Sequence, residues 1–278
     1  MVSFQDKYFD IDGMKMHYID EGSGQPMLML HGNPTWSYFY RDLISHFSGT
    51  NRVVAPDHIG MGLSDKPQDR DYCLSFHIEN LARLIDGLGL NNIILIVHDW
   101  GGPIGFGYAL DHLESVKKII ILNTAAFHYE HIPKRLDVCR GRLGGFVVRR
   151  LNAFARAATI MCAEKTLTKE TRKMYLAPYD SFENRIGIYS FVRDIPMSET
   201  HRSRQLLNSI ESRIPGIEAE VLILWGRKDF VFTEHFYDRW RAFFPRARAV
   251  LYDDAGHYVL EDKTNEVIKE IEDFIILK

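Results

Sequence analysis

Short apolar runs alternate with helical patterns along the first 122 residues of this chain. The runs Met27–Leu30, Arg52–Ala55, Ile93–Val97 and Ile119–Leu122 are almost continuously apolar, which is typical of strands that are buried on both faces. Between them lie segments with apolar residues at helical spacing, such as residues 76–88. Strands of this kind that alternate with helices predict a parallel sheet with helices on both faces.

The two ends of the chain extend the same architecture. Near the N-terminus, Lys7–Ile11 and Met14–Ile19 flank an Asp-Gly dipeptide, which is a strong signal for a β-hairpin. Near the C-terminus, the apolar run Ala249–Leu251 precedes a helical pattern over Lys263–Ile276. We therefore expect a hairpin at one end of the chain and further strand and helix units at the other.

The strand and helix pattern stops at Asn123 and resumes only at Val221–Trp225. The intervening segment is helical by pattern, rich in arginine and alanine, and contains no comparable apolar strand. A structureless loop of that length is not expected inside a domain, so we predict a structured insert over the sheet. We place a core at residues 1–124 and 214–278, and a helical cap at residues 125–213.

The composition narrows the possible classes of function. Hydrophobic residues make up 46% of the chain and charged residues 26%, which is typical of a soluble globular protein. A net charge of -3 gives no general electrostatic reason to bind nucleic acid. No stretch has the roughly 18 apolar residues of a membrane span, and no leader pattern opens the chain, so a cytoplasmic location is expected. The three cysteines are widely spaced, so neither disulfides nor a zinc site are expected.

The segment Val97–Gly102 lies where a buried strand meets a helix. A sharp turn at such a place lifts one side chain above the edge of the sheet, and small residues after it permit close packing. Asp99 occupies this nucleophile position. The common form of the turn has glycine two residues before the nucleophile, whereas this chain has Val97, so only the downstream half matches. The alternative is that Asp99 merely caps the helix.

The loop His31–Trp36 follows an earlier strand. In a fold with such a turn, this loop supplies one backbone N–H to an oxyanion hole, and the residue after the nucleophile, here Trp100, supplies the other. Asn33 also offers a side-chain amide. The alternative is a simple turn, because Asn-Pro is a frequent turn dipeptide.

Two further polar residues, Asp229 and His257, follow late strands. Asp99, Asp229 and His257 thus occur in the chain order of nucleophile, acid and histidine that is typical of the α/β-hydrolase fold. Each lies at the carboxyl end of a strand, where open α/β sheets place their sites. The joint occurrence favours a catalytic triad over incidental placement.

These motifs resemble the haloalkane-dehalogenase branch of the α/β-hydrolase superfamily, over nearly the whole chain. The resemblance implies a mostly parallel eight-stranded sheet flanked by helices, with a helical cap. It also implies that Asn33 and Trp100 hold a departing anion or halide. Some dehalogenases place their catalytic acid as Glu directly after the strand that ends at Leu122, and since this chain has Asn123 there, Asp229 is favoured as the acid.

A nearer resemblance is to the β-lactone decarboxylases of bacterial long-chain olefin biosynthesis. It is carried by five segments, four of them in the expected cap: 57–62, 123–128, 152–154, 177–179 and 193–196. This resemblance implies decarboxylation of long-chain cis-dialkyl β-lactones to alkenes and carbon dioxide, with no cofactor and no metal. Hydrolytic release of halide from haloalkanes is the alternative, and an epoxide hydrolase or a non-catalytic binding protein of the same fold is a weaker one.

The residue types fit this chemistry. A carboxylate nucleophile disfavours ordinary ester or peptide hydrolysis and suits displacement at a saturated carbon. For a haloalkane, His257 would be the base for a later water attack, with Asp229 orienting its ring. For a β-lactone, opening the ring at its alkyl–oxygen bond releases a carboxylate into the same donor pair, and attack by Asp99 at the acyl carbon is the alternative.

Other side chains of the expected cap have simpler interpretations. His128 and His131 have the spacing of metal ligands but lack a cluster of Cys or carboxylate residues. Three tyrosines that could protonate an epoxide oxygen are expected to pack within the cap: Tyr175, Tyr179 and Tyr189. A solvated basic face, or a surface that contacts a membrane, acyl chains or a partner enzyme, is expected from Lys134, Arg135, Arg140, Arg142, Arg149, Arg150 and Arg156.

Overall fold

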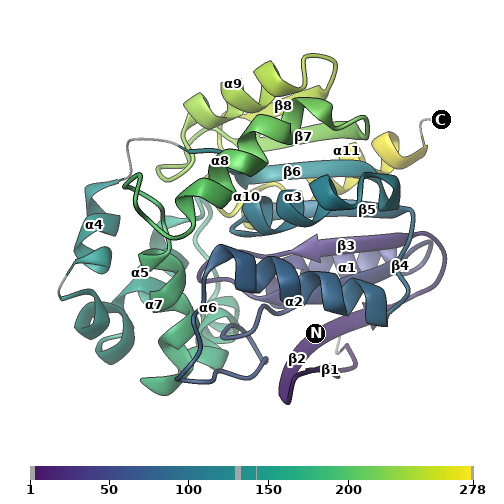
Figure 1. The fold of residues 1–278 in the computed structure, drawn as a ribbon. Coiled ribbons are helices and arrows are strands. Elements are labelled where there is room, and N and C mark those ends of the chain that lie inside the picture. Colours follow the sequence, from purple (N-terminus) through teal and green to yellow (C-terminus); the bar gives the residue numbers. More distant parts are fainter. Residues whose placement is uncertain (1–3, 129–132, 142, 277–278) are drawn as a thin grey trace.

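The computed structural model of the 278-residue chain describes residues 4–128, 133–141 and 143–276. Its centre is an eight-stranded sheet in the order β1-β2-β4-β3-β5-β6-β7-β8 (Figure 1). β2 is antiparallel to both β1 and β4, and every other neighbouring pair is parallel. The predicted mostly parallel eight-stranded sheet is therefore confirmed. The strands are β1 (Lys7–Ile11), β2 (Met14–Glu21), β3 (Pro26–Leu30), β4 (Arg52–Pro56), β5 (Ile93–Asp99), β6 (Val116–Thr124), β7 (Glu220–Gly226) and β8 (Arg248–Tyr252).

The central strands are buried because helices cover both faces of the sheet. Every residue of β5 is buried, which explains its unbroken apolar sequence. In Figure 1, α2 (Leu74–Gly87), α3 (Gly101–Asp111) and α8 (Arg204–Arg213) lie in front of the sheet, whereas α1 (Arg41–Phe47) and α11 (Thr264–Ile276) lie behind it. The remaining helices that follow β7 are α9 (Glu234–Phe243) and α10 (Val259–Asp262).

The long insert between β6 and β7 is helical, as the sequence pattern predicts. Its first four α-helices lie together to one side of the sheet (Figure 1). They are α4 (Lys134–Arg140), α5 (Ala153–Met161), α6 (Lys169–Leu176) and α7 (Ile186–Arg193). We call this part of the insert the cap. The cap also contains the π-helix η3 (Phe146–Arg150) and the short 3₁₀ helices η4 (Ala177–Tyr179) and η5 (Glu183–Arg185). Short 3₁₀ helices elsewhere in the chain are η1 (Ser37–Tyr40), η2 (Leu113–Ser115) and η6 (Ile214–Gly216).

α8 falls within the range predicted for the cap, yet it packs on the core. The guanidinium of Arg213 donates to the carbonyl of Leu110 and pairs with Asp111 at 2.8 Å. A Cβ on Gly107 of α3 would lie 3.4 Å from the Ile210 side chain. The exact division at residues 124/125 and 213/214 stays a prediction, and α8 connects the two parts.

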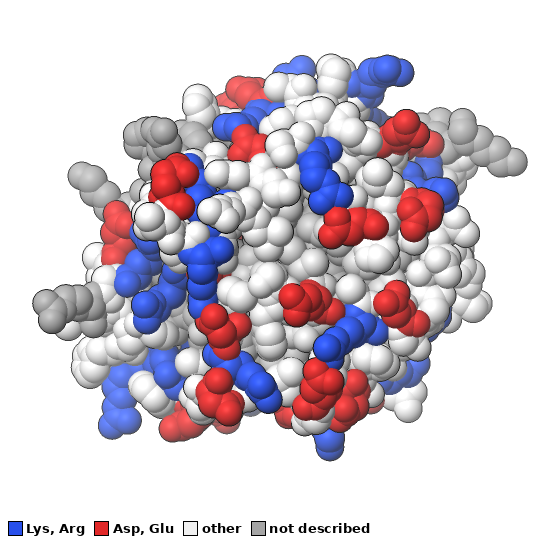
Figure 2. All heavy atoms as spheres, viewed as in Figure 1, with Lys and Arg blue, Asp and Glu red and all other residues white. Residues whose placement is uncertain are grey.

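Several basic side chains adjoin one another over the cap, whereas acidic and basic side chains are interspersed over α2 and α3 (Figure 2). Within residues 4–128, 133–141 and 143–276, no helix is long and apolar enough to cross a membrane. The cytoplasmic location stays a prediction. The cysteines Cys73, Cys139 and Cys162 are free thiols.

Candidate active site

The turn between β5 and α3 holds Asp99 in a left-handed backbone conformation, with φ at +50°. Non-glycine residues rarely adopt this conformation, and it is concentrated at functional sites. Two glycines make the turn possible. A Cβ on Gly101 would lie 2.0 Å from the carbonyl oxygen of Leu30, and one on Gly102 would lie 1.9 Å from Oγ1 of Thr124. Packing thus requires glycine in the downstream half of the motif. It does not require glycine at position 97, where Val97 lies inside the buried strand.

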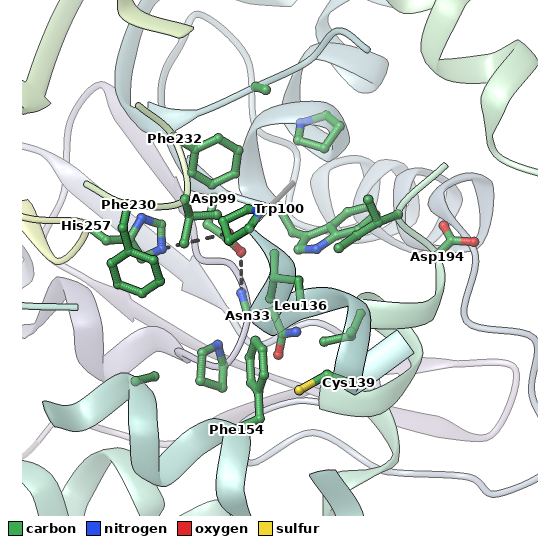
Figure 3. Close-up of a pocket in the computed structure, with 18 of the residues that line it drawn as sticks. Asn33, Asp99, Trp100, Leu136, Cys139, Phe154, Asp194, Phe230, Phe232 and His257 are labelled. Atoms are coloured by element: carbon green, nitrogen blue, oxygen red, sulfur yellow. Dashed lines mark hydrogen bonds and ion pairs between the residues drawn. The ribbon is translucent and has the colours of Figure 1, made fainter. Parts of the chain in front are cut away.

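The loop after β3 reaches the carboxylate of Asp99 directly. The backbone N–H of Asn33 donates to Oδ1 of Asp99 over 2.5 Å, as Figure 3 shows. A Cβ on Gly32 would lie 2.0 Å from that same oxygen, so only glycine lets the loop approach so closely. The structure therefore brings together the two segments that the sequence analysis assigned to the nucleophile and to the anion hole.

The side chain of Asn33 makes a contact that the motif does not predict. Its Nδ2 donates to the carbonyl of Ile188 in α7 over 3.1 Å, and its Oδ1 is buried without a partner among the described residues. An amide nitrogen carries two hydrogens, so one remains for a bound anion. The indole N–H of Trp100 donates to no residue in the described part of the chain, and both side chains line the same cavity.

Asp229 and His257 complete the site from β7 and β8. Nδ1 of His257 lies 2.8 Å from Oδ2 of Asp229, and Nε2 of the same ring lies 3.8 Å from Oδ2 of Asp99. Oδ1 of Asp229 accepts two further hydrogen bonds, from the backbone N–H groups of Val231 and Phe232. All three side chains are almost fully buried. This is the geometry of nucleophile, histidine and orienting acid.

The electrostatics of the site favour a charged histidine beside the carboxylate. Burial raises the pKa of Asp99 above its usual value, against the opposing effects of His257 and the backbone N–H groups of Asn33 and Trp100. Burial lowers the pKa of His257, but Asp229 and then Asp99 outweigh it, so that this pKa lies above its usual value. Asp99 and His257, which both have a raised pKa, thus face each other, and perturbed pKa values of this kind often occur at catalytic sites.

Three supporting residues escaped the sequence analysis in this role. Nδ2 of Asn123 donates to Oδ2 of Asp229 over 2.9 Å, and its Oδ1 accepts from the N–H of Gly226. Nε2 of His98 bonds to the carbonyl of His257 over 2.9 Å. Asp262 accepts a hydrogen bond from the backbone N–H of Gly256, in the loop that carries His257. Asn123 and His98 adjoin recognised motifs, which is a usable signal, whereas no motif points to Asp262.

A cavity of about 470 Å³ opens beside Asp99, and its walls are mainly apolar. His257, Phe230 and Phe232 lie on one side of Asp99, and Asp194 lies well away on the other (Figure 3). Asp194 is itself satisfied by Ser203, Arg202 and the N–H of Leu74, and burial raises its pKa to about 6. Asp99 thus lies between two stretches of apolar wall.

Of the residues with simpler interpretations, His128 lines the cavity and the three tyrosines do not. Nδ1 of His128 lies 2.7 Å from the guanidinium of Arg204, and His131 lies outside the described residues. The hydroxyl of Tyr175 bonds to Glu261, and that of Tyr179 to the carbonyl of Thr35. None of the three tyrosines of the cap lines the cavity. In the described ranges, no group of three or more His, Cys, Asp or Glu side chains is placed to hold a metal ion.

Comparison with known proteins places this geometry in a family. Residues 25–264 match the family described as alpha/beta hydrolase fold. A protein of Shewanella oneidensis named cis-3-alkyl-4-alkyloxetan-2-one decarboxylase is 43% identical, over 99% of this chain and 89% of its own length. A protein of the same name from Xanthomonas campestris pv. campestris is 40% identical, over 98% of this chain and 96% of its own length.

More distant matches are haloalkane dehalogenases. Haloalkane dehalogenase 2 of Mycobacterium tuberculosis is 29% identical over 96% of this chain and 94% of its own length. The crystal structure of the haloalkane dehalogenase DatA from Agrobacterium tumefaciens C58 superposes with a TM-score of 0.90 at 22% identity, over 98% of this chain and 96% of that chain. Both resemblances predicted from the motifs are confirmed.

Proposed function

This chain belongs to the α/β-hydrolase fold family, and we propose that it is an enzyme that converts long-chain cis-dialkyl β-lactones into alkenes and carbon dioxide. The observation that carries the proposal is the carboxylate of Asp99, which faces an apolar cavity at the position where the fold places its nucleophile. The two decarboxylases, at 40% and 43% identity over nearly the whole chain, support this choice of substrate.

The proposed reaction needs only the lactone and Asp99. Oδ2 of Asp99 attacks the ring carbon that bears the ring oxygen, and the alkyl–oxygen bond breaks to release a carboxylate. The bond between that carboxylate and its carbon then breaks, carbon dioxide leaves, and the bonding electrons form the carbon–carbon double bond as the Asp99 carboxylate departs. No water, metal or cofactor enters the balance.

The roles of the surrounding residues follow from the charge that forms in each step. The released carboxylate is held by the Trp100 indole N–H and the remaining amide hydrogen of Asn33, since preorganised donors stabilise a charge as it forms. His257 lies 3.8 Å from Oδ2 of Asp99, where an imidazolium stabilises the carboxylate when it leaves. Asp229 holds that ring in place through Nδ1.

The shape of the cavity suits two alkyl arms. On one side of Asp99 the wall includes Phe230 and Phe232, and on the other it runs toward Leu74 and Asp194 (Figure 3). A linear chain would use one side only, whereas a dialkyl ring uses both. Because burying each methylene contributes roughly 0.8 kcal/mol, we expect kcat/KM on lactones to rise with arm length until the cavity is full.

The test compares two substrate classes on the purified protein. Given cis-dialkyl β-lactones of graded arm length, the wild type should release alkene, measured by gas chromatography, and carbon dioxide. Matched bromoalkanes should release halide more slowly. The Asp99→Ala variant is the control for uncatalysed breakdown. Rapid halide release without alkene above that control would refute the lactone assignment.

Haloalkane hydrolysis is the second candidate, favoured by the Trp100 indole N–H, which is directed to no acceptor in the described structure and suits a halide. It makes a separate prediction for His257→Ala. Displacement needs only the carboxylate, but hydrolysis of the alkyl ester needs a base, so the variant should accumulate an adduct on Asp99. Intact-mass measurement after incubation with short and long bromoalkanes decides the point, and no adduct with any of them counts against this candidate.

A further inference from the structure

The charge of the chain is unevenly distributed along its sequence. Residues 134–161, which include α4, η3 and α5 of the cap, contain seven basic residues and one acidic residue. The net charge of this segment is +6 in a chain of net charge -3, so the remaining residues together carry -9. Arg150 and Arg156 are exposed and form no ion pair within the part of the chain that the structure describes. The positive charge is therefore concentrated in one segment of an otherwise acidic protein.

The same segment holds most of the exposed large apolar side chains. Of eleven such side chains among the described residues, six lie between residues 138 and 161. They are Val138, Leu143, Phe146, Leu151, Ile160 and Met161, and Leu143 is 70% exposed. Phe182, a seventh, packs under the guanidinium of Arg149 at 3.9 Å. Single exposed apolar side chains scattered over a protein are normal, so the occurrence of six in this one segment is the feature that needs an explanation.

The mouth of the cavity opens on this face. Most residues that line the cavity are buried or half-buried. Three described lining residues are exposed, namely Val138, Ala157 and Met161, and all three belong to the segment 134–161. A molecule therefore enters the cavity between α4 and α5, past the exposed side chains of Val138 and Met161.

We propose that the exposed side chains of this part of the cap dock on an anionic lipid bilayer, and that the enzyme takes its substrate directly from that bilayer. The side chains in question are Val138, Leu143, Phe146, Arg150, Leu151, Arg156, Ile160 and Met161. The second half of this proposal rests on the proposed function, because a long-chain dialkyl lactone partitions into lipid. Basic residues and exposed apolar side chains in one segment are typical of interfacial binding, in which the apolar groups enter the acyl boundary while the cations meet anionic headgroups.

Charge and polarity disfavour other occupants. A symmetric dimer through this face would oppose two segments of net charge +6. Nucleic acid would use the basic residues but leave the exposed leucine, isoleucine and phenylalanine side chains in water. An acidic apolar protein surface has the right chemistry, and the test below separates it from lipid because the binding assay contains no second protein.

Vesicle flotation with the purified full chain tests the docking surface without reference to catalysis. We expect the wild type to float with vesicles of phosphatidylcholine and phosphatidylglycerol and to stay behind with phosphatidylcholine alone. Raising the salt from about 0.1 M to about 1 M shortens the screening length from ~10 Å to ~3 Å and should weaken binding strongly. Arg150→Gln with Arg156→Gln should weaken it about fivefold for each residue, or roughly 25-fold together.

Matched variants separate the apolar from the electrostatic contribution. Leu143→Ser with Phe146→Ser should abolish flotation, whereas Tyr8→Ser with Leu113→Ser, which removes side chains of comparable exposure from the core surface, should leave it unchanged. Circular dichroism confirms that each variant is folded. A wild type that does not float with anionic vesicles overturns the proposal, as does a dimer that the Leu143→Ser and Phe146→Ser variant dissociates.

The link to catalysis has its own comparison. The arginine variant should convert lactone in detergent micelles at the wild-type rate and lactone in anionic vesicles at least tenfold more slowly. Equal loss in both settings contradicts substrate delivery from the bilayer. Flotation without any lactone turnover by the wild type would refute the proposed function and leave the docking surface standing.

Discussion

Nδ2 of Asn123 donates a hydrogen bond of 2.9 Å to Oδ2 of Asp229, the same oxygen that accepts from Nδ1 of His257. The end of β6 therefore fixes the acid that follows β7. In the proposed mechanism Asp229 orients His257, so that Asn123 acts through two other side chains without lining the cavity. It is a positioning residue.

Asn123→Ala should lower kcat without a comparable change in KM. Leaving a buried polar partner unmatched costs about 1–3 kcal/mol, which corresponds to a decrease in kcat of roughly 5- to 150-fold if the misplacement is felt in the transition state. Steady-state kinetics on a β-lactone measure both constants. A rise in KM with unchanged kcat would show that Asn123 shapes substrate binding instead.

Asp99→Asn should abolish activity and increase stability. Loss of a nucleophile costs on the order of 10⁴-fold or more in rate. Burial raises the pKa of Asp99, so ionisation of this group favours unfolding at pH values above its usual pKa of 3.8. The variant lacks this effect, and its stability relative to the wild type should grow as pH rises. Denaturant unfolding at several pH values, together with turnover, checks both parts, and near-normal activity would contradict the mechanism.

Asp262→Ala should destabilise the protein far more than a change at a nearby surface carboxylate. Asp262 is fully buried, and it accepts backbone hydrogen bonds from Gly256 at 2.8 Å, Glu164 at 3.0 Å and Lys165 at 2.8 Å. Each orphaned donor costs about 1–3 kcal/mol, so we expect a loss of at least about 3 kcal/mol in the free energy of unfolding. Asp254→Ala, which changes an exposed carboxylate in the loop that carries His257, is the control. Equal midpoints for the two variants would contradict this assignment.

His77→Phe should reduce the acid sensitivity of the fold. His77 is buried against Phe191, both of its ring nitrogens lack a partner among the described residues, and burial lowers its pKa to about 3. Below about pH 6.5 the unfolded chain binds a proton at His77 and the native state does not. The free energy of unfolding therefore decreases as the pH is lowered from roughly 6 to 4, by up to about 1.4 kcal/mol per pH unit. The variant should lose this part of the slope. Identical slopes in the two proteins would show that His77 is not the group responsible.

Much of the architecture was determined by local sequence pattern. Continuous apolar runs such as Ile93–Val97 occur only where helices cover both faces of a strand, and the chain order of Asp99, Asp229 and His257 follows from the order of the strands that carry them. The glycines after Asp99 likewise signal a close approach of two backbones. These features are short-range, so they can be recognised without knowing what lies across the sheet.

Only the tertiary structure decided which side chains support the site and what the cap presents to its surroundings. Asn33 donates one amide hydrogen to the carbonyl of Ile188, 155 residues away. Asp262 accepts hydrogen bonds both from the loop of His257 and from Glu164 in the cap. Such contacts depend on packing between distant segments, which leaves no periodic signal in the sequence. For the same reason the basic residues of the cap could be counted in the sequence, but the opening of the cavity beside Val138 and Met161 could not be derived until α4 and α5 were placed.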